Sequence, residues 1–146
     1  MGLPTLLVVE DNPDHLELTL IALEQSGTHH DIVVARDGLE ALDFLFCQGL
    51  YRDRNSAEQP EVVLLDLGMP KMNGLQVMQR MRDDPRTSSV PVIMLTSASE
   101  QSEALRALQG GLCSYVSKPL QSHDFVVKLE EAREYSRLLN LRPLIP

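Results

Sequence analysis

The sequence predicts an α/β protein built on a five-stranded parallel sheet with helices on both faces. Short runs of Val, Leu and Ile alternate with longer segments of helical periodicity, and such runs are typical of strands buried on both faces. The 146 residues suit one domain, which at this size buries roughly 70% of the surface that its unfolded chain exposes. We expect right-handed crossovers between successive strands.

The first half of the chain predicts two pairs of strand and helix. Residues 6–9 and 32–35 are short apolar runs that suit strands. Between them, Pro13 to Ser26 has helical periodicity, and Gly27 suits the position just after a helix. Gly38 to Cys47 predicts a second helix. The residues expected on the buried faces of these helices are Leu16, Leu20, Leu23, Leu42, Leu45 and Phe46.

The second half predicts three more pairs after a polar, aperiodic surface loop at residues 48–60. The predicted strands are residues 62–66, 92–96 and 115–116. The predicted helices lie between Gly74 and Asp83, from Glu100 to Leu108, and from His123 to Leu139 after a capping Ser122. The residues expected on the buried faces of the first and last of these are Val77, Met78, Met81, Phe125, Leu129 and Ala132. The last residues, 140–146, contain two prolines and are expected to form a tail.

Composition and charge narrow the functional classes. The formal net charge is −8 and no run of Lys or Arg occurs, so binding to nucleic-acid phosphates would be electrostatically poor. No apolar stretch approaches the ~20 residues needed to cross a membrane, and the start lacks the features of a secretory signal, so we expect a cytoplasmic protein. Cys47 and Cys113 lack a CxxC spacing and are expected to be reduced thiols. His29 and His30 are expected in a solvated turn.

Four predicted strands end in residues that can bind phosphate or a divalent cation. Glu10-Asp11 follow the first strand, Asp66 ends the third, Thr96-Ser97 end the fourth, and Lys118 follows the last. Open parallel sheets bind ligands where the carboxyl ends of their strands share one edge. We therefore expect three acids, a hydroxyl and one lysine to meet. Taken singly, these residues also suit a helix N-terminus, a turn or a solvated surface.

The chain closely resembles the receiver domain of two-component response regulators. The motifs that carry this resemblance are Glu10-Asp11, Asp66 with Met69-Pro70 and Asn73-Gly74, Thr96-Ser97-Ala98, and Tyr115 before Lys118-Pro119. The resemblance implies a flavodoxin-like sheet of strand order 2-1-3-4-5, a receiver domain at residues 1–139, a tail at 140–146 and no output domain. The long segment before Asp66 is also similar to that of single-domain regulators that partner phytochrome-type histidine kinases.

The resemblance also implies a role for each site residue. Asp66 would accept a phosphoryl group from a kinase phosphohistidine, and Thr96, Ser97, Tyr115 and Lys118 would bind it or respond to it. Mg²⁺ would be held by Asp11, Asp66 and the backbone carbonyl of Gly68, with Glu10 acting directly or through a water molecule. The charges of one dication and one lysine balance the negative charges of three carboxylates. Mg²⁺ is the expected dication because it prefers oxygen ligands. The resemblance further implies that the peptide bond between Lys118 and Pro119 is cis.

Two other classes of function stay open at this stage. One is a phosphohydrolase with an aspartate nucleophile. That chemistry requires a second acid, two residues after the nucleophile, to act as general acid, and this chain has Gly68 there. The other is an interaction domain that does not use phosphate. A flavin-binding protein is disfavoured because no phosphate-binding loop rich in Gly, Ser and Thr follows the first strand.

The apolar pattern of the last predicted helix indicates an interaction between two copies of the chain. It is apolar on more than one side, whereas a doubly wound sheet buries only one stripe of a helix. We expect a homodimer that uses the fourth helix, the fifth strand, the fifth helix and the tail. The residues that suggest it are Val126, Val127, Tyr135, Leu138, Leu139, Leu141, Leu144 and Ile145.

Overall fold

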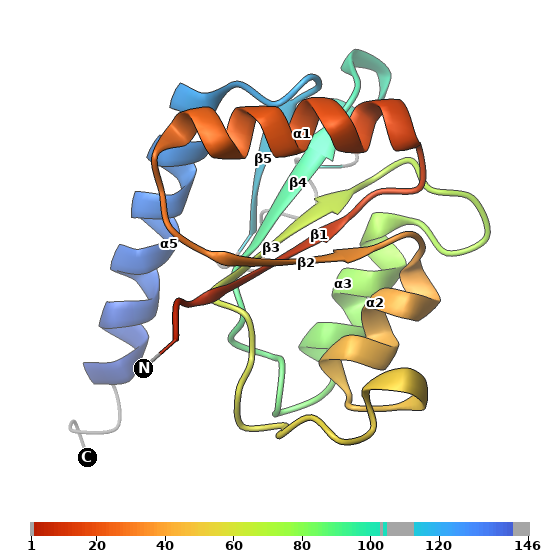
Figure 1. Ribbon diagram of the computed structural model, residues 1–146, viewed down its shortest axis with the longest axis vertical. Coiled ribbons are helices and arrows are strands. Elements are labelled where there is room, and N and C mark those ends of the chain that lie inside the picture. Colours follow the sequence, from red (N-terminus) through yellow and green to blue (C-terminus); the bar gives the residue numbers. More distant parts are fainter. Residues whose placement is uncertain (1, 103, 105–112, 142–146) are drawn as a thin grey trace.

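Five parallel strands form one sheet in the order β2-β1-β3-β4-β5, as predicted (Figure 1). The computed structural model describes residues 2–102, 104 and 113–141. The strands are β1 (Thr5–Val9), β2 (Asp31–Ala35), β3 (Val62–Asp66), β4 (Val92–Thr96) and β5 (Cys113–Ser117). In the register of the sheet, Val9 pairs with Ala35 and Leu65, and Thr96 pairs with Ser117. The carboxyl ends of the strands therefore lie along one edge.

Helices cover both faces of the sheet (Figure 1). They are α1 (Pro13–Ser26), α2 (Gly38–Leu45), α3 (Gly74–Arg82) and α5 (Ser122–Leu141), with short 3₁₀ helices η1 (Gly49–Tyr51) and η2 (Ala98–Glu100). Most of the helix predicted at residues 100–108 falls outside the described residues. No helix in the described part of the chain has both the length and the apolar character that a membrane crossing requires.

The core has two layers because successive side chains of a strand point to opposite faces. On one face, Leu6 and Val8 of β1 belong to an apolar cluster with Leu16 of α1 and Phe125 of α5. On the other face, a second cluster joins the sheet to α2 and α3. Its main members are Leu7, Val9, Leu42, Leu45, Val77 and Met81. All five residues of β3 are buried, as expected for a central strand covered on both sides.

Local capping signals explain where two helices begin and end. Asn12 accepts hydrogen bonds from the first turn of α1, and Gly27 closes that helix with a φ of 74°, a conformation that glycine adopts without strain. At α3, Asn73 and Gln76 form a reciprocal capping box. The predicted bounds of α1, and the predicted end of α3 at Asp83, are confirmed.

Two other predicted boundaries were wrong. The second helix was expected to reach Cys47, but α2 ends at Leu45, and Cys47 has a φ of 55° that cannot continue a helix. The last helix was expected to end at Leu139, whereas α5 continues to Leu141, because the prolines that prevent helix lie further along the chain. The first two residues of the expected tail are thus helical, and the others lie outside the described residues.

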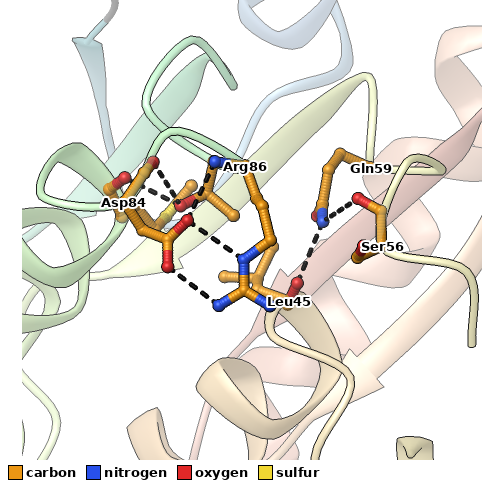
Figure 2. A network of polar contacts seen from close by, with 7 residues as sticks. Leu45, Ser56, Gln59, Asp84 and Arg86 are labelled. Atoms are coloured by element: carbon orange, nitrogen blue, oxygen red, sulfur yellow. Dashed lines mark hydrogen bonds and ion pairs between the residues drawn. The ribbon is translucent and has the colours of Figure 1, made fainter.

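The polar segment between α2 and β3 is tied to α2. Gln59 donates hydrogen bonds to the carbonyl oxygens of Leu45 at 2.9 Å and Ser56 at 3.0 Å, and nearby Arg86 pairs with Asp84 (Figure 2). Arg54 donates to the Phe44 carbonyl and lies 3.7 Å from the centre of the Phe44 ring. The expectation of a solvent-facing charged loop is therefore wrong for Arg54.

The expectation for the histidine pair was half wrong. His29 is exposed, but the His30 side chain is only 2% exposed and its Nε2 lies 2.7 Å from Glu61 Oε1. His30 also packs edge-on against Phe125. Both contacts join residues distant in sequence, so no local pattern could reveal the burial.

Candidate metal and phosphoryl site

The parallel sheet brings the predicted site residues to one edge. Glu10 directly follows β1 and Lys118 directly follows β5, while Asp66 and Thr96 are the last residues of β3 and β4. Backbone hydrogen bonds extend the sheet through these positions, from Glu10 N to Ala35 O at 3.0 Å and from Lys118 N to Thr96 O at 2.8 Å. Topology and register thus bring the predicted positions to the same edge of the sheet.

Three carboxylates meet at this edge. Glu10, Asp11 and Asp66 each offer one oxygen, and these oxygens lie within 4.8 Å of one another. Glu10 and Asp66 are buried and Asp11 is exposed. When Glu10 is ionised, its buried Oε1 has no hydrogen-bond donor among the described residues, which is costly unless a ligand completes its coordination. A set of hard oxygen donors with one unsatisfied buried atom fits a small dication such as Mg²⁺.

Lys118 brings a positive charge to these acids. Its Nζ lies 2.6 Å from Asp66 Oδ1 and 3.7 Å from Glu10 Oε1. Burial alone would lower the pKa of Lys118, but the hydrogen bond to Asp66 and the nearby acids raise it above its usual value. The ammonium is therefore held charged, and it offsets one of the three carboxylates.

Glu10 and Asp66 have opposite pKa shifts. Burial, with a hydrogen bond to Asp66 and its charge, raises the pKa of Glu10 to about 8. Burial also acts to raise the pKa of Asp66, but hydrogen bonds from Glu10, Lys118 and the Gly68 backbone outweigh it and lower that pKa. Without a metal at neutral pH, Glu10 thus holds a proton and Asp66 remains an anion, the state that a nucleophile needs.

The backbone around Asp66 holds its side chain in place. The Gly68 N–H donates to Asp66 Oδ1 at 3.0 Å, and Leu67 N donates to Leu95 O at 3.1 Å. Gly74, at the start of α3, packs so closely that an added Cβ would lie 2.7 Å from the Asp66 carbonyl oxygen. Only glycine fits there. The Lys118-Pro119 bond is cis, as the resemblance implied.

Thr96 lies at the site, but its hydroxyl is turned toward the backbone. It is fully buried, and Oγ1 donates to the Val116 carbonyl at 3.3 Å. Ser97 begins η2, and its Oγ lies 3.1 Å from Ser99 Oγ. Thr96 would have to exchange its bond to Val116 in order to bind a ligand at Asp66.

Tyr115 lies beside the site in β5. It pairs with Met94 of β4, is half-buried, and packs against the core layer beneath α2 and α3. It also lines a surface groove with His123 and Val127 of α5. Tyr115 therefore connects the site edge to the outer surface of α5.

Glu100 is a site neighbour that the sequence analysis missed. A methyl group built on Gly68 would overlap Glu100 Oε2, so this carboxylate lies over Gly68. The available signal was the Ser97-x-x-Glu100 pattern, which is a capping box. That pattern accounts for one carboxylate oxygen and gives no indication that the other faces Gly68.

These features define a flavodoxin-like α/β protein with an acidic pocket at the carboxyl ends of its strands. Residues 6–130 match the family model of the response regulator receiver domain. The chain belongs to this family, whose members are signalling phosphoacceptors in two-component systems and partner histidine kinases.

Three relatives locate the chain within the family. It is 35% identical over 130 residues to the "Probable methanogenesis regulatory protein FilR2" of Methanothrix harundinacea, covering 89% of this chain and 81% of the relative. The bacteriophytochrome response regulator RtBRR is 42% identical with a TM-score of 0.81, over 90% of this chain and 78% of that one. The Mn²⁺-bound response regulator Rcp1 is 27% identical with a TM-score of 0.68, over 90% of each chain.

Proposed function

We propose that this protein is a response regulator whose Asp66 accepts a phosphoryl group from the phosphohistidine of a histidine kinase when Mg²⁺ is present. The observation that carries the proposal is the charge-assisted contact of 2.6 Å between Lys118 Nζ and Asp66 Oδ1, beside the converging oxygens of Glu10 and Asp11. An anionic carboxylate at a strand end, flanked by a cation and a metal-binding set, suits phosphoryl transfer.

The reaction would form a bond between phosphorus and a carboxylate oxygen of Asp66. The bond between phosphorus and the kinase imidazole would break, and its electron pair would stay on the imidazole nitrogen. Negative charge spreads over the phosphoryl oxygens in such a transition state, so Lys118 and the Thr96 hydroxyl are suited to stabilise it. Mg²⁺, held by Glu10, Asp11, Asp66 and the Gly68 carbonyl, would neutralise further charge. The Mn²⁺-bound form of Rcp1 supports a dication in this role.

The same residues suggest how the signal leaves the site. Thr96 would leave the Val116 carbonyl for the phosphoryl group, with Ser97 beside it, and Tyr115 would turn inward and change the surface formed with α5. The phosphoryl group must favour one of the two arrangements for the switch to work. Output would pass through altered protein contacts, as in a phosphorelay.

The partner we propose is a phytochrome-type histidine kinase in the cytoplasm. The support is the 42% identity to a bacteriophytochrome response regulator over 90% of this chain. We also propose a homodimer through α5 and the tail, since Val127 is 39% exposed and Leu138 is 50% exposed on a helix that already buries Phe125. Sedimentation velocity at tens of micromolar tests this, and a monomer that tail truncation leaves unchanged would contradict it.

Phosphotransfer from a bacteriophytochrome kinase tests the proposed function. Label should move from the kinase to the wild-type protein with Mg²⁺, and it should not move with EDTA or to Asp66→Asn. Asp84→Asn, which alters a partly exposed acid paired with Arg86 away from the site, is the matched control and should accept label normally. Equal labelling of Asp66→Asn and wild type would refute the proposal.

A further inference from the structure

We infer that the Glu100 carboxylate orients the water that hydrolyses the phosphoryl group on Asp66, and so sets the lifetime of the signal. This inference rests on the proposed function. It assigns a chemical role to a residue that lies four positions after Thr96 and outside the set that binds metal and phosphate. The argument depends on where the two oxygens of Glu100 lie.

Glu100 fills the space that a side chain at position 68 would occupy. Gly68 is two residues after Asp66, and its N–H donates to Asp66 Oδ1 at 3.0 Å. Any Cβ at this position would overlap Glu100 Oε2. The carboxylate therefore lies over the residue whose N–H binds Asp66, although it comes from a different strand-end segment.

The protein holds Glu100 in this position by two tethers. Glu100 Oε1 accepts a hydrogen bond from Ser97 N at 2.8 Å, directly after β4. The next residue, Gln101, donates from its Nε2 to Ser117 Oγ at 3.1 Å, which ties the segment to β5. One oxygen is thus used in capping, and Oε2 is directed over Gly68. The charge of Glu100 also contributes to raising the pKa of Lys118, which agrees with its closeness to the site.

A carboxylate here suits a water molecule better than a direct contact with the phosphoryl group. Two anions in contact repel, whereas a water between them can donate one hydrogen to Glu100 and direct its oxygen at phosphorus. In hydrolysis, the water oxygen would bond to phosphorus as the bond from phosphorus to the Asp66 oxygen breaks. The electron pair would return to the Asp66 carboxylate, and both protons of the water would leave on inorganic phosphate.

Glu100→Gln is the direct test. Glutamine keeps the length of the side chain and an oxygen for the Ser97 N–H, but it replaces Oε2 with an NH₂ group that cannot accept from water. The protein would be labelled with acetyl phosphate and Mg²⁺, and the loss of phosphate followed. We expect a lifetime about five- to ten-fold longer than in wild type, the effect of one hydrogen bond. Glu40→Gln, an acid of the α2 first turn, is the matched control and should leave the lifetime unchanged.

Gly68→Ala tests the role of Glu100 by displacing its carboxylate instead of replacing it. Its methyl group would displace the end of the Glu100 side chain, so the lifetime should lengthen as in Glu100→Gln. In a Glu100→Ala background the same methyl group meets no carboxylate, so it should add nothing further. Additive effects of Gly68→Ala and Glu100→Ala would overturn the inference.

Other outcomes separate this inference from the proposed function. If Asp66 takes up no phosphate at all, the proposed function fails. If Asp66 is labelled but Glu100→Gln decays at the wild-type rate, only the role of Glu100 fails. A change confined to Mg²⁺ affinity, with the same decay at saturating Mg²⁺, would also overturn it, because Glu100 would then act on the metal.

Discussion

The two edges of the sheet carry acids with opposite surroundings, buried at one edge and half-buried at the other. At the carboxyl edge, Glu10 and Asp66 face Lys118, and Glu10 Oε1 lacks a hydrogen-bond partner in the described chain. At the amino edge, Glu61 receives two hydrogen bonds of 2.9 Å from Arg133 and lies 2.7 Å from His30 Nε2. The pKa of Glu10 is raised to about 8, whereas that of Glu61 is lowered despite its burial.

The comparison shows that the charge of Glu61 is fully paired within the protein, whereas the charges at the carboxyl edge are only partly paired. The Glu61 carboxylate is satisfied by groups of the protein itself and joins the start of β3 to α5. The carboxyl edge carries more carboxylates than its own lysine can offset, an arrangement that suits the cation and the phosphoryl group proposed above. Perturbed pKa values at converging acids are typical of functional sites, and four predictions sharpen this contrast.

The largest effect is expected from removing the cation at the carboxyl edge. Lys118→Ala should lower the rate of phosphorylation by acetyl phosphate by about 10² to 10³, the cost of one preorganised charge in a transition state. Arg133→Ala removes the corresponding cation at the amino edge and should leave that rate unchanged. Comparable losses in both variants would mean that the two edges do not differ as described.

The stability of the metal-free protein should fall as pH rises from 5.5 to 7.5. The raised pKa of Glu10 means that folding takes up a proton in the window between about 4.5 and about 8. Each pH unit within that window can cost up to ~1.4 kcal/mol, so the free energy of unfolding should drop by about 2 kcal/mol. Urea unfolding in EDTA measures this. Glu10→Gln should remove the slope.

Neutralising one acid at each edge should change stability in opposite directions at pH 7.5 without metal. Glu61→Gln loses charge-assisted hydrogen bonds to Arg133, which is partly exposed, so we expect a destabilisation of about 1 kcal/mol. Glu10→Gln removes the proton that Glu10 must take up on folding at this pH and should be neutral or stabilising. Urea midpoints compare the two, and destabilisation of both variants would contradict the contrast.

The smallest effect on stability is expected at Thr96. Thr96→Val keeps the side-chain shape and loses one hydrogen bond of 3.3 Å to Val116 O, so the free energy of unfolding should change by less than about 1 kcal/mol. The NMR signals of the Tyr115 ring should nevertheless stop responding to phosphorylation. Thr96→Ser keeps the hydroxyl and should preserve the response.

Much of the fold could be predicted because its signals are local. The Pro13–Ser26 helix has a capping asparagine, a Pro at its start and a closing glycine, and β1, β2, β3 and β4 each contain a run of four apolar residues. The end of α2 was missed because Phe46 and Cys47 are apolar residues that suit a helix, while the chain turns there with a positive φ at Cys47. The burial of Arg54 and His30 depends on partners distant in sequence.

The candidate site was predictable to the extent that strand ends position it. Parallel pairing of the strands brings Glu10, Asp66, Thr96 and Lys118 to one edge of the sheet, and this placement does not depend on the conformation of the loops. Glu100 differs, because its position over Gly68 depends on the path of the η2 turn and on the absence of a side chain at Gly68. The hydroxyl direction of Thr96 and the proton on Glu10 depend on burial and neighbouring charges, which a sequence pattern does not record.

Peptide mapping by mass spectrometry after incubation with acetyl phosphate and Mg²⁺ tests the central claim most directly. We predict a phosphoryl group on the peptide that contains Asp66, and its loss when EDTA replaces Mg²⁺ or when Asp66 is changed to Asn. An unmodified Asp66 peptide from folded protein at saturating Mg²⁺ would contradict the account.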